Sequence, residues 1–282
     1  MSVAQNQAIE ITNASNSSFT MAFRILPKQK RLDMNIYYAF CRVVDDIADD
    51  PDMPIAEKQA RLDEWKTWIQ SPTPQDPALP TALLQVAATY NIPHRLFLEL
   101  IDGVESDLTP ARISTYQDLL SYCYKVASTV GLVIVRIFGY KNPDTEKYAL
   151  ELGYALQVTN IIRDVGKDYA NEKRIYLPQD EMGRFNVTEE TIASGKESPD
   201  FIRLMTHMAE KAHAHYKNCQ TLLPACDRRS VAPAEIMKNV YFRLLLEMEQ
   251  DSFHVLQNFY RISKAKKVAI LCQTLLRSFL PF

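Results

Sequence analysis

Apolar residues recur along most of the chain at spacings of three and four positions, the period of a helix with one buried face. No internal repeat and no strand-like alternation is visible in the sequence. The pattern predicts helices over residues 28–50, 55–70, 79–90, 94–107, 115–139, 144–168, 199–223, 231–260 and 264–279. We therefore expect an all-α protein.

Two stretches interrupt the helical pattern. Residues 71–80, SPTPQDPALP, contain four prolines, which a helix interior does not accept. Residues 176–200 are irregular, with one short helix predicted after Thr188. Because amphipathic segments lie on both sides of the proline-rich stretch, we interpret it as a surface loop and expect one domain over residues 1–282.

Composition supports helices and limits the classes of function. The 282 residues are 47% hydrophobic and include only seven glycines, so a large helical core is possible. The net charge of −2 gives no overall attraction to nucleic acid. The N-terminus lacks a secretory signal pattern, and the apolar run VGLVIVRIFGY is too short to span a bilayer. We expect a cytoplasmic protein.

An acidic run follows the aromatic segment MNIYYAF in the first long predicted helix. Asp45 and Asp49 are four positions apart and Arg42 lies one turn earlier, so the three side chains share one helix face. Carboxylates at this spacing repel each other and are unfavourable near a helix C-terminus. A solvated helix end fits this pattern less well than a functional site.

A second acidic face occurs in the segment QVTNIIRDVGKDY. Asn160, Asp164 and Asp168 recur every four positions and form a polar stripe on an otherwise apolar helix, flanked by Gln157 and Arg163. An ordinary amphipathic helix, with basic neighbours paired to the acids, is the alternative interpretation. The two motifs together favour a functional site.

The two acidic faces have the chemistry that Mg²⁺ requires. Magnesium prefers oxygen ligands and is typically held by one or two carboxylates together with substrate phosphates. Two facing helices with carboxylates one turn apart can hold several ions around a diphosphate. The ions neutralise the charge that develops as the diphosphate leaves carbon.

Several segments carry a family resemblance that covers about residues 15–270: SSFTMAFRILPKQKR, YYAFCRVVDDIADD, YCYKVASTVG and LGYALQVTNIIRDVGKDYANEKRIYLP. They resemble the head-to-head prenyl synthases, which comprise squalene, dehydrosqualene and phytoene synthases. The later segment LLPACDRRSVAPAEIMKNVYFRLL is most similar to the bacterial presqualene-diphosphate-forming subgroup of hopanoid pathways.

The resemblance implies an isoprenoid synthase fold, a helical barrel around a deep apolar cavity capped by the two aspartate motifs. The implied magnesium ligands are Asp45, Asp49, Asn160, Asp164 and Asp168. The implied diphosphate contacts are Ser18, Tyr38, Arg42, Gln157, Arg163 and Tyr241. The implied lining of the prenyl channels is Phe19, Phe23, Tyr122, Val126, Ala127, Val130 and Gly131. The expected catalytic residues are Asp45, Asp49, Asp164, Asp168, Arg42 and Tyr38.

Two positions depart from the family pattern. Ser128 stands where the family has a glycine, and we expect it to narrow or polarise a channel wall. The segment from Asp168 to Arg174 is one residue longer than usual, so Arg174 is left out of the predicted phosphate ligands.

The reaction implied by the resemblance joins two farnesyl diphosphates 1′-1 into presqualene diphosphate with release of diphosphate, and can continue to squalene or dehydrosqualene. NADPH is required only if the reaction proceeds to squalene. The alternative within the family is a phytoene synthase acting on two geranylgeranyl diphosphates. The alternative of another class is a non-catalytic helical scaffold whose acidic faces bind a basic partner. Prenyl diphosphates are the expected partners, with downstream isoprenoid enzymes as further candidates.

The C-terminal segment RISKAKKVAILCQTLLRSFLPF places four basic residues, Arg261, Lys264, Lys266 and Lys267, before an apolar run. A basic cluster beside an amphipathic helix is typical of peripheral binding to anionic lipid. A last core helix with a solvated basic start fits the same pattern, and the sequence leaves both interpretations open.

Overall fold

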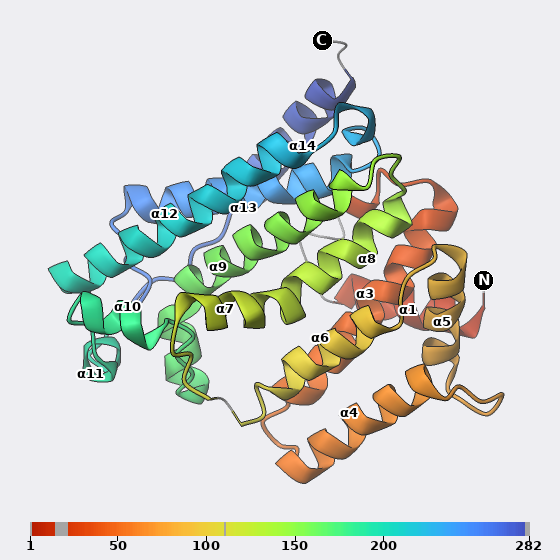
Figure 1. The fold of residues 1–282 in the computed structure, drawn as a ribbon, viewed down its shortest axis with the longest axis horizontal. Helices are drawn as coiled ribbons and strands as arrows, with labels where there is room; N and C mark the ends of the chain where they lie inside the picture. Colours follow the sequence, from red (N-terminus) through yellow and green to blue (C-terminus); the bar gives the residue numbers. More distant parts are fainter. Residues whose placement is uncertain (1, 15–21, 110, 280–282) are drawn as a thin grey trace.

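The structure, a computed structural model, describes residues 2–14, 22–109 and 111–279, and within these ranges it contains helices and no strand (Figure 1). The all-α prediction is confirmed. The α-helices are α1 (Val3–Ala14), α3 (Lys28–Asp49), α4 (Ile55–Gln70), α5 (Ala78–Thr89), α6 (Arg95–Glu105), α7 (Tyr116–Cys123), α8 (Thr129–Phe138), α9 (Asp144–Glu172), α10 (Gln179–Arg184), α11 (Glu189–Ala193), α12 (Pro199–Leu222), α13 (Ala232–Gln250) and α14 (Lys264–Phe279).

The predicted helix 231–260 is wrong in its last ten residues, because α13 ends at Gln250. Ser252 and Phe253 adopt the left-handed conformation, with φ of 52° and 55°, and turn the chain. Phe253 and Val255 are nonetheless buried, at 3% and 2% exposed. The apolar pattern therefore continues here because the segment packs on the core in a non-helical conformation.

Helix α1 was not predicted from the sequence. Its buried residues are Ala4, Ala8 and Thr12, four positions apart, and the helix contacts α3 and α5. Small side chains at these positions give a correct helical period with little hydrophobicity, so the signal is weak. The short helix expected after Thr188 is present as α11, which Thr188 caps by accepting a hydrogen bond from the Thr191 amide.

Residues 116–138 form one continuous helix of 23 residues in which a π-helical turn, Tyr124–Ser128, joins α7 to α8. By length and composition this helix could cross a membrane. In the sequence, only the shorter run VGLVIVRIFGY was compared with the thickness of a bilayer, so this possibility was not predicted. It contacts α6 and α9 and supplies residues to two cavities, so we interpret it as a core helix.

Buried apolar side chains form two large clusters that meet along α9. The first half of α9, including Tyr148 and Leu152, belongs to the cluster with α1, α3, α5, α6 and α8. The second half, including Val158 and Ile162, packs with α12 and α13. Helix α9 therefore runs through the centre of the molecule and carries the second acidic motif with it.

Candidate active site

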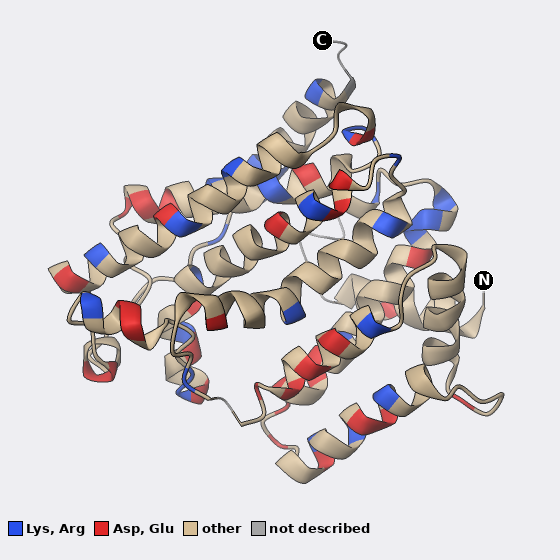
Figure 2. Cartoon of the chain, in the orientation of Figure 1, with Lys and Arg blue, Asp and Glu red and all other residues tan. Residues whose placement is uncertain are grey.

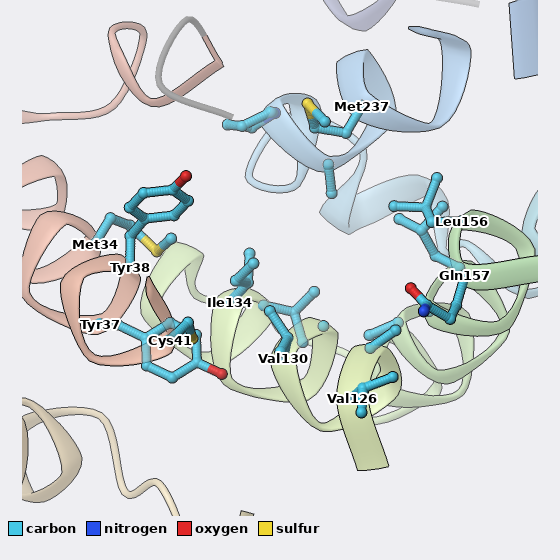
Figure 3. Close-up of a pocket in the computed structure, with 18 of the residues that line it drawn as sticks. Met34, Tyr37, Tyr38, Cys41, Val126, Val130, Ile134, Leu156, Gln157 and Met237 are labelled. Atoms are coloured by element: carbon cyan, nitrogen blue, oxygen red, sulfur yellow. The ribbon is translucent and has the colours of Figure 1, made fainter. Parts of the chain in front are cut away.

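An apolar cavity of about 330 Å³ lies between α3, α8, α9 and α13 (Figure 3). Its volume is in the range of small-molecule sites. Tyr38 and Met34 approach it from α3, Val130 and Ile134 from α8, and Met237 from α13. The walls are mostly aliphatic and aromatic, so the cavity favours a hydrocarbon ligand.

A polar cavity of about 410 Å³ adjoins the apolar one. Of the residues that the structure describes, seven line both cavities: Tyr38, Cys41, Asp45, Val126, Val130, Gln157 and Asn160. The two cavities therefore form one site with a charged end and an apolar end. The far end of the apolar cavity, away from the acidic residues, is lined by Met34, Ile134, Phe138 and Ala149.

The structure brings both acidic motifs to the polar cavity, as the sequence predicted. Helix α3 contributes Asp45 and Asp49, and α9 contributes Asp164 and Asp168. Tyr38, Arg42, Gln157 and Asn160 also line this cavity. The two helices present their polar stripes to the same space, an arrangement suited to a ligand of high negative charge bound through cations.

Burial and mutual repulsion perturb two of these carboxylates. Burial, followed by the charge of Asp164, raises the pKa of Asp168 to about 7. Burial, followed by the charge of Asp49, raises the pKa of Asp45 to about 6. The Asp45 side chain is 53% exposed to the water of the cavity, which screens its repulsion, so Asp168 is the more strongly perturbed group.

The donor set fits Mg²⁺. The Oδ1 atom of Asn160 is buried and accepts no hydrogen bond, although it lies in a helix that lines the polar cavity. An unsatisfied buried acceptor beside repelling carboxylates is the environment that a cation relieves. Among the described residues no group of three or more His, Cys, Asp or Glu side chains is arranged to hold a metal alone. Magnesium bound partly through substrate phosphates and water does not need such a group.

The two predicted diphosphate-binding arginines differ in position. Arg42 lines the polar cavity and pairs with Asp45 at 3.5 Å and with Asp46. Arg163 lines neither cavity, and its guanidinium donates to Asp164 at 2.8 and 2.5 Å. Arg163 therefore orients a carboxylate of the acidic motif from outside the cavity.

Most of the predicted channel residues line the apolar cavity: Phe23, Val126, Ala127, Val130 and Gly131. Tyr241, predicted as a diphosphate contact, also lies there. Tyr122 lies instead on the polar cavity, where its hydroxyl donates to Asp107 at 3.0 Å. Ser18 and Phe19 lie outside the described residues.

The π-helical turn holds the wall that contains Val126 and Ala127 close to its neighbours. A Cβ on Gly103 of α6 would lie 2.8 Å from Val126, and a Cβ on Gly153 of α9 would lie 2.5 Å from the Cα of Ser128. Gly103 and Gly153 therefore allow α6 and α9 to pack closely against the π-helical turn. π-Helical turns are frequent at functional sites because they shift side chains out of the ordinary register.

The expectation that Ser128 narrows or polarises the channel wall is wrong. Ser128 is 0% exposed and is absent from the lining of the apolar cavity. Its hydroxyl donates to the carbonyl of Leu150 in α9 at 2.9 Å. The side chain faces the neighbouring helix, because Gly153 leaves space for it.

Several residues of the polar cavity were missed or set aside in the sequence, among them Asp107, Arg174 and Tyr176. Asp107 accepts hydrogen bonds from Tyr122 at 3.0 Å and from Tyr176 at 2.9 Å. Arg174 donates to the Asp107 carbonyl at 3.0 Å and lies 3.8 Å from Asp49. No local pattern marks Asp107, which follows the end of α6. Arg174 reaches the cavity because left-handed Lys173 turns the chain at the end of α9.

Comparisons with known proteins agree with this geometry. The family model described as "Squalene/phytoene synthase" matches residues 12–266. Phytoene synthase of Mycobacterium tuberculosis is 33% identical over 274 residues, 95% of this chain and 89% of the relative. Presqualene diphosphate synthase of Rhodopseudomonas palustris is 34% identical over 265 residues, 92% of this chain and 93% of the relative.

A crystal structure of a dehydrosqualene synthase in complex with ligand is 28% identical and covers 98% of this chain and 97% of its own, with a TM-score of 0.82. The likeness in fold thus extends over nearly the whole chain, and the family match includes both acidic motifs. The chain therefore belongs to the squalene/phytoene synthase family and is a prenyltransferase that condenses prenyl diphosphates head to head.

Proposed function

We propose that this enzyme condenses two farnesyl diphosphates to presqualene diphosphate. The observation that carries the choice of a C15 substrate is the depth of the apolar cavity. Met34 precedes Asp45 by 11 positions in α3, so it lies about 16 Å along the helix at 1.5 Å per residue. This depth suits three extended isoprene units, whereas a fourth unit reaches the far end, where Met34 and Phe138 lie.

Similarity in sequence is divided between the two substrates, and most of the similar relatives are named phytoene synthases. The segment LLPACDRRSVAPAEIMKNVYFRLL resembles the presqualene-diphosphate-forming subgroup, and the R. palustris relative is named for that activity. The M. tuberculosis relative, which is similar at nearly the same identity, is named a phytoene synthase. Synthesis of phytoene from two C20 diphosphates is therefore the second candidate.

The family typically depends on Mg²⁺. The residues that would hold it are Asp45, Asp49, Asn160, Asp164 and Asp168. When bound, magnesium supplies Lewis-acid stabilisation of the departing diphosphate.

The chain's own residues bind, orient and shield the substrates. Arg42 presents a planar guanidinium to the polar cavity, suited to bidentate contact with diphosphate oxygens. Gln157, at the junction of the two cavities, offers an amide where head group and chain meet. The apolar walls exclude water from a carbocation, and the ring of Tyr38, which also lines both cavities, stabilises positive charge without reacting with it.

Product analysis tests the proposal. Purified protein is incubated with Mg²⁺ and either C15 or C20 diphosphate, with and without NADPH, and the products are identified by mass spectrometry. We expect presqualene diphosphate from the C15 substrate without NADPH. Phytoene as the main product, formed from the C20 substrate, would replace the proposal with the second candidate. A scaffold would form no product and would gain no thermal stability from farnesyl diphosphate with Mg²⁺.

A further inference from the structure

The outward face of α14 is apolar. Val268 and Leu276 are 53% and 66% exposed, and Ala265, Ala269 and Cys272 are also exposed. These five residues lie on one side of the helix. Leu275, which borders this side because it follows Val268 by two turns, and Leu271 pack against the cluster formed with α13. A surface helix normally places polar residues outward, so this face needs an apolar partner.

Basic residues border this face. Lys264 and Arg277, at the two ends of α14, are exposed, and Lys266 is 52% exposed although it pairs with Glu247 at 2.6 Å. In Figure 2, blue marks basic residues on α14 and at the start of α3. An apolar strip with a basic border is the pattern of a helix that lies in the interface of an anionic membrane.

A third cavity lies between the edge of this face and the reaction site. Leu275 of α14 lines it together with apolar Ile25 and Leu26 and with three basic residues, Lys30, Lys141 and Arg229. Its only acidic lining residue among those described is Asp227, which is buried and accepts hydrogen bonds from the chain itself. Phe138 and Pro233 line both this cavity and the apolar cavity of the active site.

We propose that the apolar face of α14 and the basic rim of the third cavity dock onto an anionic lipid bilayer. Among the described residues, Phe138 and Pro233 are the two that line both cavities, so the docked face lies next to the far end of the apolar cavity. A hydrocarbon-rich product then passes to the bilayer at the end opposite the diphosphates. The product's identity rests on the proposed function, whereas binding to the bilayer does not.

Charge argues against a second copy of this chain as the partner that covers the apolar face of α14. A symmetric dimer through the same face brings the basic rim of one copy against that of the other, and like charges repel. Anionic headgroups instead neutralise Lys264, Arg277 and the basic residues of the third cavity. The apolar strip then enters the region between headgroups and acyl chains.

Co-sedimentation with vesicles tests the proposal without measuring turnover. The full chain is mixed with vesicles of phosphatidylglycerol and phosphatidylcholine, or of phosphatidylcholine alone, at low and high salt. We expect binding to the anionic vesicles at low salt and its loss at high salt. Val268→Glu combined with Leu276→Glu should weaken binding at least tenfold. Ile55→Glu is the matched control, because Ile55 is an equally exposed apolar residue (56%) on α4, and it should leave binding unchanged within twofold.

Lys264→Gln and Arg277→Gln examine the charge contribution separately. Each should weaken binding about fivefold at low salt, the equivalent of the ~1 kcal/mol that one basic residue contributes near an anionic surface. Thermal melts check that the variants are folded. Wild-type protein that stays in the supernatant overturns the proposal, and so does a dimer that Leu276→Glu dissociates. Vesicle binding by a protein that lacks turnover leaves the docking proposal standing and rejects the proposed function.

Discussion

The substitution Asp168→Asn should stabilise the ligand-free protein while it removes the response to ligand. The pKa of Asp168 is raised to about 7, against a reference value of 3.8, first by burial and then by Asp164. The folded protein therefore binds this proton more tightly than the unfolded chain does. The carboxyl favours folding at low pH, and this contribution is lost as the pH rises through about 7.

The size of the effect follows from the same numbers. A difference of about 3 in pKa corresponds to about 4 kcal/mol at pH 8, where Asp168 is ionised in both states. Water in the polar cavity screens the repulsion, so we expect about half, or ~2 kcal/mol. For a protein of this size that raises the Tm of the ligand-free variant by about 5 °C. The gain should fall to less than half at pH 5, because folded wild type is then protonated at Asp168.

Differential scanning fluorimetry at pH 8 and pH 5, with and without Mg²⁺ and inorganic diphosphate, measures both effects. Wild type should gain stability from the two ligands together, and the Asp168→Asn variant should gain little and lose most turnover. Asp63→Asn, an exposed carboxylate on α4, is the control and should change neither property. A ligand-free Asp168→Asn protein no more stable than wild type at pH 8 would refute the view that the acidic site is held under repulsion.

Three further predictions address the arginine, the helix contact and the cavity depth. Arg42→Lys should raise the KM for farnesyl diphosphate about tenfold, because an ammonium group cannot make a bidentate contact; an unchanged KM would make Arg42 a structural ion-pair partner. Gly153→Ala should lower the free energy of unfolding, measured with urea, by about 3 kcal/mol, since the new Cβ would lie 2.5 Å from the Cα of Ser128. Gly183→Ala is the control: a Cβ there would meet nothing within 4 Å, so the free energy of unfolding should stay unchanged or rise. Met34→Ala should increase the use of C20 relative to C15 diphosphate at least fivefold in a competition assay, and an unchanged ratio would show that Met34 does not limit chain length.

The sequence predicted most helices because a buried helical face leaves a strong period in residues such as those of α3 and α9. It missed α1, whose buried positions are small, and it extended α13 beyond Gln250 because buried residues at 253 and 255 continued the pattern. Periodicity reports which residues are buried. It does not report whether the backbone between them remains helical.

The site was predicted where the chemistry is local and missed where it depends on tertiary contacts. Asp164 and Asp168 are four positions apart, so their shared face can be read directly from the sequence. Asp107 has no such neighbour, and its role becomes visible only when Tyr122 and Tyr176 donate hydrogen bonds to it. Isolated polar residues at the end of a helix are common, so nothing in the sequence distinguishes this one.

Ser128 shows why a single substitution can be misinterpreted from sequence. A serine in place of glycine beside channel residues suggests a change in the channel, yet the side chain direction depends on the π-helical turn, which the helical period of residues 115–139 does not reveal. That turn directs Ser128 towards α9, where Gly153 leaves room and the Leu150 carbonyl accepts its hydroxyl hydrogen. The hydroxyl is satisfied within the helix contact, so it adds no polarity to the apolar cavity. Chain length is therefore expected to depend on Met34 and Phe138 at the far end, and Ser128 should contribute to stability alone.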